Sequence, residues 1–171
     1  MELIKTQTLP TRSFDHGNNG KSVHVLIGGF YWGSGDIKVK TVLGSCVSIC
    51  MWNKKKKMGG LCHFSLPGRR SRKRYPLNGF YGDDAIHLFL DIIKRTSTVI
   101  DDYEVEMYGG ASMFDQENDI DFLHIGQRNI ESSKEKLKKL GFKIKNENCG
   151  GTFSRHVTFD LSTGLIHLRV I

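Results

Sequence analysis

The chain of 171 residues is long enough for one domain with a sizeable hydrophobic core. Its composition, with 39% hydrophobic and 25% charged residues, is ordinary for a globular protein and excludes a disordered or collagen-like chain. The sequence contains no apolar run of about 18 residues, so it predicts no membrane insertion. Its start lacks the apolar core of a secretory signal, which predicts a cytoplasmic protein with reduced thiols.

Positive charge is concentrated in the first half of the chain. Residues 1–80 contain 14 Lys and Arg against 3 Asp and Glu, whereas the whole chain has a net charge of +7. This asymmetry favours an anionic partner. The densest run is a predicted loop over 67–76, which is either a solvated loop or a docking patch for an acidic partner. Its basic residues are Arg69, Arg70, Arg72, Lys73 and Arg74. Because aromatic residues do not interleave with them, nucleic acid is not expected.

The first third of the chain predicts a loop followed by a hairpin. Residues 1–35 are interpreted as an N-terminal arm or loop, with a short strand candidate at 23–27, and residues 36–171 as one domain. Apolar and polar residues alternate over 37–43, which indicates a half-buried strand. A turn at Gly44 and Ser45 leads into an apolar strand over 46–52. After a charged turn at 53–57, residues 58–66 are expected to return as its hairpin partner.

The remainder of the chain mixes helices with strands. Apolar spacing predicts a helix over 83–95, and a second helix around Ile130 and Leu137 that ends at Gly141. Strands are predicted over 103–108, 142–145, 156–160 and 165–170, with a turn at 162–164 joining the last two. The irregular alternation predicts an α+β fold, a mixed β-sheet sandwich with flanking helices, rather than a doubly wound parallel sheet.

Cys46 is the strongest candidate for chemistry among the four cysteines. The cysteines and histidines lack the spacing of a zinc site, so no metal is expected. Cys50 lies within an apolar strand and is predicted to be a core residue, as is Cys62. Cys46 follows the turn at Gly44 and Ser45, where backbone amides near Ser45 could point at a substrate oxygen.

His63 lies 17 residues after Cys46, on the returning strand of the predicted hairpin. With the turn centred near 53–57, Cys46 is expected to face roughly residue 64, which brings His63 within reach. A Cys–His pair provides thiolate and imidazolium for acyl transfer. On pattern alone, a buried structural cysteine beside a satisfied polar histidine is the commoner interpretation.

A series of short blocks makes the chain recognisable. They are TVLGSCV at 41–47, GGLCHFSLP at 59–67, YGDDA at 81–85, YGGASMF at 108–114 and IGQRN at 125–129, followed by Gly150-Gly151 with Arg155 and then Thr163-Gly164. In this order they resemble the CheD family, the chemoreceptor glutamine deamidases of bacterial and archaeal chemotaxis. The resemblance extends from about residue 39 to the C-terminus.

The resemblance implies a specific activity. The family hydrolyses the side-chain amide of selected glutamines on methyl-accepting chemotaxis receptors, and its fold resembles the catalytic domain of cytotoxic necrotizing factor. The family's nucleophile matches Cys46 and its base matches His63. No metal or organic cofactor is implied. Receptors are the expected partners, with a CheC-like phosphatase as a further one. The alternative is a non-catalytic module that binds chemoreceptors or such a phosphatase.

The sequence departs from the family pattern at one catalytic position. Some members carry a third catalytic residue, a Thr six positions before the Cys, and here that position is Lys40. Thr41 is adjacent, but an offset of one residue on a strand moves a side chain to the opposite face. Either a bulge realigns Thr41 or another group orients the histidine.

Overall fold

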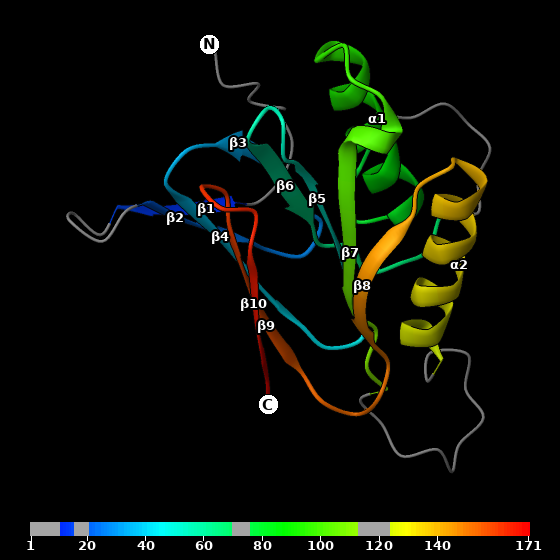
Figure 1. The fold of residues 1–171 in the computed structure, drawn as a ribbon. Helices are drawn as coiled ribbons and strands as arrows, with labels where there is room; N and C mark the ends of the chain where they lie inside the picture. The colour runs from blue at the N-terminus through cyan, green and yellow to red at the C-terminus, as the bar shows by residue number, and fades with distance from the viewer. Residues whose placement is uncertain (1–10, 16–20, 70–75, 113–123) are drawn as a thin grey trace.

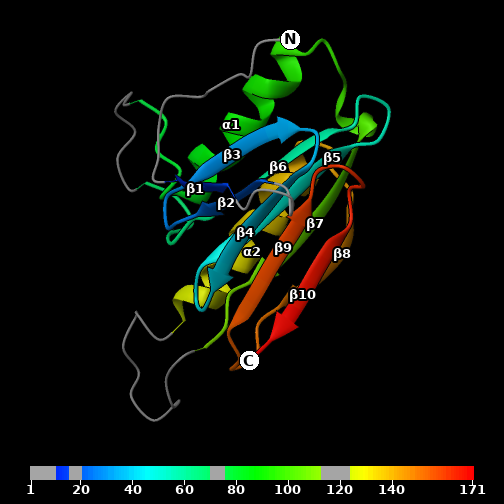
Figure 2. The ribbon, with the colours of Figure 1, turned by 90° about the vertical axis from the view of Figure 1, so that its left-hand side faces the viewer.

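The computed structural model describes residues 11–15, for which it gives the backbone alone, and residues 21–69, 76–112 and 124–171. Two five-stranded sheets lie face to face, and two helices cover the outer face of one of them (Figure 1). In the view turned by 90°, the helix-free sheet lies in front and the helices lie behind (Figure 2). The predicted α+β sandwich with flanking helices is therefore confirmed.

The first sheet has the strand order β1-β2-β4-β9-β10. These strands are β1 (Thr11–Asp15), β2 (Lys21–Val25), β4 (Ile37–Leu43), β9 (Arg155–Asp160) and β10 (Ile166–Val170). Strands β2 and β4 run parallel, and the other three pairs are antiparallel.

The second sheet has the strand order β3-β6-β5-β7-β8 and carries the helices. Its strands are β3 (Phe30–Ser34), β6 (Met58–Cys62), β5 (Val47–Asn53), β7 (Tyr103–Gly109) and β8 (Ile144–Cys149). The helices are α1 (Gly82–Arg95) and α2 (Ile125–Lys139), with a short 3-10 turn, η2 (Ile100–Asp102). Strands β7 and β8 are parallel, as expected where a helix connects two strands.

Strand β5 lies at the centre of the second sheet, and all its residues are buried. Val47 and Ile49 pack toward the helices, whereas Cys46 and Cys50 belong to the core between the two sheets. Both faces of β5 are therefore covered, which explains why its sequence is a continuous apolar run rather than an alternating one. The backbone of β5, which begins directly after Cys46, is consequently held by packing against the helices on one face and against the other sheet on the opposite face.

The structure refines the predicted elements. The hairpin of β5 and β6, both helices and the turn between β9 and β10 form as predicted. The expected N-terminal arm differs, because the described residues before 36 include β1, β2 and β3, which contribute to both sheets. Their short length and their Gly and aromatic residues obscure the period of two that indicates strands. Among the described residues, no helix is both long and apolar enough to span a membrane.

Candidate active site

Cys46 lies at the bend between β4 and β5, immediately before β5 begins. Its side chain is 8% exposed, compared with 1% for Cys50 and 0% for Cys62. The two strand cysteines are core residues, as predicted, and all four cysteines are free thiols. Of the three cysteines in the β5–β6 hairpin region, Cys46 is thus the most exposed to solvent.

The hairpin register places Cys46 and His63 on the same face of the sheet. Val47 and Phe64 exchange two backbone hydrogen bonds of 3.0 Å, so Cys46 lies opposite Ser65 rather than opposite residue 64. His63 is then the diagonal neighbour of Cys46, within the range that a long or aromatic side chain can cover. The Ser65 hydroxyl lies beside the Cys46 thiol.

Thr41 orients the ring of His63. Thr41 Oγ1 lies 2.8 Å from His63 Nδ1 and 2.8 Å from the carbonyl oxygen of Val25. Because a carbonyl can only accept, the Thr41 hydroxyl donates to Val25 and accepts from Nδ1–H of the ring. This assigns the proton to Nδ1 and leaves a lone pair on Nε2. His63 Nε2 is buried and has no hydrogen-bond partner among the described residues.

The position of Thr41 needs no bulge. Strand β4 pairs with β9 in continuous register from Lys38 to Leu43. Thr41 lies on the buried face of β4 and is 3% exposed, whereas Lys40 alternates to the other face. Thr41, one position after the Thr that the resemblance led us to expect, therefore points inward and contacts the histidine in this chain.

Burial favours the uncharged form of both candidate catalytic groups in the free protein. It lowers the pKa of His63 to about 4, an effect that the Val25 carbonyl only partly offsets. Burial also raises the pKa of Cys46, against a smaller lowering by the Ser65 hydroxyl. Both shifts favour a neutral thiol beside a neutral imidazole, not the resting thiolate–imidazolium pair expected of a Cys–His pair.

At the bend, the backbone carbonyl oxygens of Gly44 and Ser45 both accept hydrogen bonds. The backbone N–H of Ala111 donates to Gly44 O at 2.9 Å, and Asn129 Nδ2 donates to Ser45 O at 3.2 Å. The N–H groups of Ser45 and Cys46 make no hydrogen bond with any described residue. Two adjacent free amides beside a thiol are the arrangement that stabilises an oxyanion.

The end of β7 and the residue that follows it pack against this bend. The Gly110 N–H donates to Cys46 O at 2.7 Å. Gly109 has φ +108°, and a Cβ at this position would collide with the same carbonyl oxygen. The glycine pair therefore permits an approach to the bend that other residues would prevent. Gly150 N–H in turn donates to Gly109 O at 2.9 Å.

The predicted docking patch lies largely outside the described residues, which leave out positions 70–75. Within it, Arg70, Arg72, Lys73 and Arg74 thus receive no structural description. Arg69 makes contacts within its own chain, an ion pair of 2.7 Å with Asp84 and a stacking contact with the ring of Tyr81. These contacts give Arg69 a structural role in the 67–84 region.

Sequence reasoning missed Ser65 and Asn129. Both lie in blocks that carried the family resemblance, HFSLP and IGQRN, but neither block indicates a spatial role. A polar residue at a buried position of an amphipathic helix was the available signal for Asn129, which is fully buried. Its two partners are 84 and 64 residues away, so spacing could not identify them.

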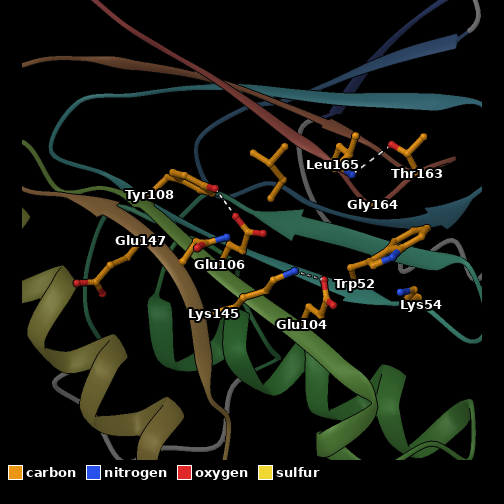
Figure 3. Close-up of a pocket in the computed structure, with 12 residues that line it drawn as sticks. Trp52, Lys54, Glu104, Glu106, Tyr108, Lys145, Glu147, Thr163, Gly164 and Leu165 are labelled. Atoms are coloured by element: carbon orange, nitrogen blue, oxygen red, sulfur yellow. Dashed lines mark hydrogen bonds and ion pairs between the residues drawn. The ribbon is translucent and has the colours of Figure 1, made fainter.

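A separate cavity of about 430 Å³ opens between the β7–β8 edge and the β9–β10 turn (Figure 3). In it, Lys145 pairs with Glu104, and the Tyr108 hydroxyl donates to Glu106. None of the sequence-predicted site residues lines this cavity. The described residues contain no cluster of His, Cys, Asp and Glu suited to a metal ion. Among the charged groups of this cavity, Glu104 and Lys145 pair with each other, whereas Glu147 pairs with Lys134 outside the lining.

Comparison with known proteins places the chain among chemotaxis proteins. Residues 65–170 match the family described as CheD chemotactic sensory transduction. A protein of Leptospira interrogans, named a probable chemoreceptor glutamine deamidase CheD 1, is 38% identical over 83% of this chain and 88% of its own length. Proteins with corresponding names from Chromobacterium violaceum and Methanococcus maripaludis are 34% and 37% identical, over 88% and 85% of this chain and 78% and 92% of their own lengths.

Proposed function

Because the chain belongs to the CheD family, we propose that it hydrolyses glutamine side-chain amides on methyl-accepting chemotaxis receptors, with Cys46 as nucleophile and His63 as base. The observation that carries the residue assignment is the state of the histidine. Thr41 accepts from Nδ1, and the buried Nε2 has no hydrogen-bond partner among the described residues, Cys46 Sγ included. A base with an unoccupied lone pair on the face of the nucleophile suits proton abstraction.

The first half of the proposed reaction forms a thioester. Cys46 Sγ attacks the carboxamide carbon of the substrate glutamine while its proton moves to His63 Nε2. The carbonyl oxygen becomes an oxyanion, which the N–H groups of Ser45 and Cys46 stabilise. When the carbon–nitrogen bond breaks, the proton on Nε2 moves to the departing nitrogen, and ammonia leaves.

The second half releases glutamate. A water molecule gives a proton to His63 Nε2 and adds to the thioester carbon, which forms a second oxyanion in the same place. The carbon–sulfur bond then breaks, and Cys46 Sγ recovers the proton from the histidine. The net reaction converts an amide and water into a carboxylic acid and ammonia, and it leaves the enzyme unchanged.

The low pKa of His63 determines when charge appears. At neutral pH the imidazole is unprotonated, so the base is available in every molecule. The ion pair forms only as the thiol attacks, when Nδ1–H already has an acceptor in Thr41 Oγ1. Thr41 thus holds the ring in the useful tautomer and stabilises the imidazolium, as the orienting residue does in a catalytic triad.

Partners and location follow from the proposed substrate. The receptor region that carries the glutamines is the first partner, and the protein works in the cytoplasm where that region lies. A CheC-like phosphatase remains a second proposed partner. The basic residues at 69–74 are proposed to dock acidic partners through the positions beyond Arg69, whose own guanidinium is engaged with Asp84.

The test is deamidation of a receptor cytoplasmic fragment followed by mass spectrometry. The wild type should add about one mass unit at specific glutamines, and Cys46→Ala should add none. Cys50→Ala is the matched control, since this thiol lies on the same strand but is buried in the core. Absence of deamidation across the whole receptor set of the organism, with protein that is folded, would overturn the proposal.

A further inference from the structure

Asn129 connects helix α2 to the two chain segments of the candidate active site. Its side chain is fully buried, and its Nδ2 donates to Ser45 O at 3.2 Å and to Ser65 O at 2.9 Å. Ser45 precedes the candidate nucleophile Cys46, and Ser65 lies opposite it. One amide group therefore uses both of its N–H donors to join the two segments at the bend.

The two carbonyl acceptors fix the orientation of the Asn129 amide. If the group were rotated by 180°, Oδ1 would face two carbonyl oxygens and no donor. In the orientation that the structure shows, Asn129 Oδ1 is buried and has no partner among the described residues. An unsatisfied buried acceptor costs about 1–3 kcal/mol. A residue that retains this cost in a packed core has a role beyond filling space.

Peptide geometry passes the effect of Asn129 to the backbone amide of Cys46. The carbonyl of Ser45 and the N–H of Cys46 belong to one planar trans peptide, in which they point in opposite directions. Holding Ser45 O against α2 therefore turns the Cys46 N–H away from the helix. The bond from Ala111 N–H to Gly44 O does the same for the N–H of Ser45.

We propose that Asn129 is a positioning residue that orients the Cys46 amide for oxyanion stabilisation, an inference that rests on the proposed deamidase function. Asn129 does not touch the reacting atoms. It acts through the Ser45 carbonyl, and the bond to Ser65 O anchors its amide so that it cannot turn. Ser133 Oγ, one turn further along α2, donates to the backbone carbonyl oxygen of Asn129 at 2.7 Å. This hydrogen bond lies within the helix and does not reach the bend at Cys46.

The thiol is held independently of Asn129. Ser65 N–H donates to Phe80 O at 3.0 Å, and Phe64 pairs with Val47, so the Ser65 hydroxyl stays beside Cys46 without the asparagine. Alkylation of Cys46 by iodoacetamide forms no oxyanion on the enzyme-bound carbon, whereas deamidation does. The two reactions therefore separate an effect on the oxyanion hole from an effect on the nucleophile.

The experiment compares wild type, Asn129→Ala, Asn129→Asp and Ser133→Ala. Each folded variant is assayed for kcat and KM on a receptor fragment and for the Cys46 alkylation rate at pH 7. Asn129→Ala and Asn129→Asp should lower kcat about 10- to 100-fold, below the effect of losing a direct oxyanion donor. KM and the alkylation rate should change less than about threefold. Ser133→Ala, which removes a buried hydrogen bond from the same helix, should keep the wild-type kcat.

Three results overturn the inference. The first is a wild-type kcat in either folded Asn129 variant, and the second is an equal loss of kcat in Ser133→Ala. The third is a parallel fall of alkylation and deamidation, which would place the effect on the thiol. Asn129→Asp has almost the shape of asparagine, so it provides the test if Asn129→Ala does not fold. A wild type without deamidase activity would instead overturn the proposed function together with this inference.

Discussion

Thr41 Oγ1 and His63 Nδ1 lie 2.8 Å apart, although the residues are 22 positions apart, Thr41 in β4 of one sheet and His63 directly after β6 of the other. The Thr41 hydroxyl also donates to the Val25 carbonyl, so its oxygen can only accept from the ring. The relationship fixes which histidine nitrogen is protonated. The reactivity assigned to His63 therefore depends on a hydroxyl group on the neighbouring sheet.

Replacement of Thr41 by Val should lower kcat about 10- to 100-fold, because the Nδ1 proton loses the Thr41 hydroxyl as acceptor and the other tautomer becomes more accessible. Thr41→Ser retains the hydroxyl and should keep kcat within about threefold. Deamidation rates and nitrogen NMR of the His63 ring measure the two effects. An unchanged tautomer and kcat in Thr41→Val would contradict the orienting role.

The pH dependence of Cys46 alkylation reports whether the thiol rests as a neutral group. Burial raises the pKa of Cys46 from its ordinary value of 9.0, so we expect the rate to rise throughout pH 6–9 without a plateau, at about tenfold per unit. Cys46 should nevertheless react before Cys50 and Cys62, which are almost fully buried. Peptide mapping identifies the labelled cysteine. A plateau between pH 5 and 8 would indicate a resting thiolate–imidazolium pair instead.

Acidification should destabilise the protein through His63. The pKa of His63 is about 4 in the folded protein against 6.5 for an unperturbed histidine, so below pH 6.5 the unfolded chain binds a proton that the folded protein does not. The free energy of unfolding should therefore fall by about 1 kcal/mol per pH unit between pH 6 and 4.5. Denaturant titrations of wild type and His63→Gln measure this, and parallel pH curves for the two proteins would refute it.

Gly109→Ala should disrupt the bend at Cys46. The added methyl group would meet Cys46 O while the backbone stays at φ +108°, and we expect a loss of about 2–5 kcal/mol together with reduced deamidation. Gly141→Ala is the matched control, because φ is +91° there and no atom lies within 4 Å of the added carbon. It should cost about 1–2 kcal/mol and leave kcat unchanged. Equal losses in both variants would show that strain alone, not the contact with Cys46, matters.

Local patterns predicted the hairpin well. The apolar run before the Lys-rich turn and the return of apolar residues after it define β5 and β6, so the relation between Cys46 and His63 was available to within one residue of register. The one-residue difference arises because the turn length, not the apolar pattern, determines which residues face each other. Ser65, and not residue 64, occupies the opposing position.

Contacts between residues far apart in the chain could not be predicted from local sequence patterns. The alternation over 37–43 already grouped Thr41 with the apolar residues, but the family pattern pointed to Lys40, and only the fold shows that Thr41 contacts His63. The bonds from Asn129 join parts of the chain that no periodicity relates. The uncharged resting state of Cys46 and His63 is likewise a consequence of burial, which depends on the complete fold.

The passage of the chain from β2 to β3 has a practical consequence. Gly28 N–H donates to His63 O at 2.7 Å, and His63 N–H donates to Gly29 O at 2.9 Å, so this crossing between sheets forms the backbone frame of the histidine. An expression fragment that starts at residue 36 would lose this frame together with β1 and β2 of the first sheet and β3 of the second. The amide proton of His63 should exchange with solvent as slowly as the most protected core amides, which makes it a probe of how tightly the two sheets hold together.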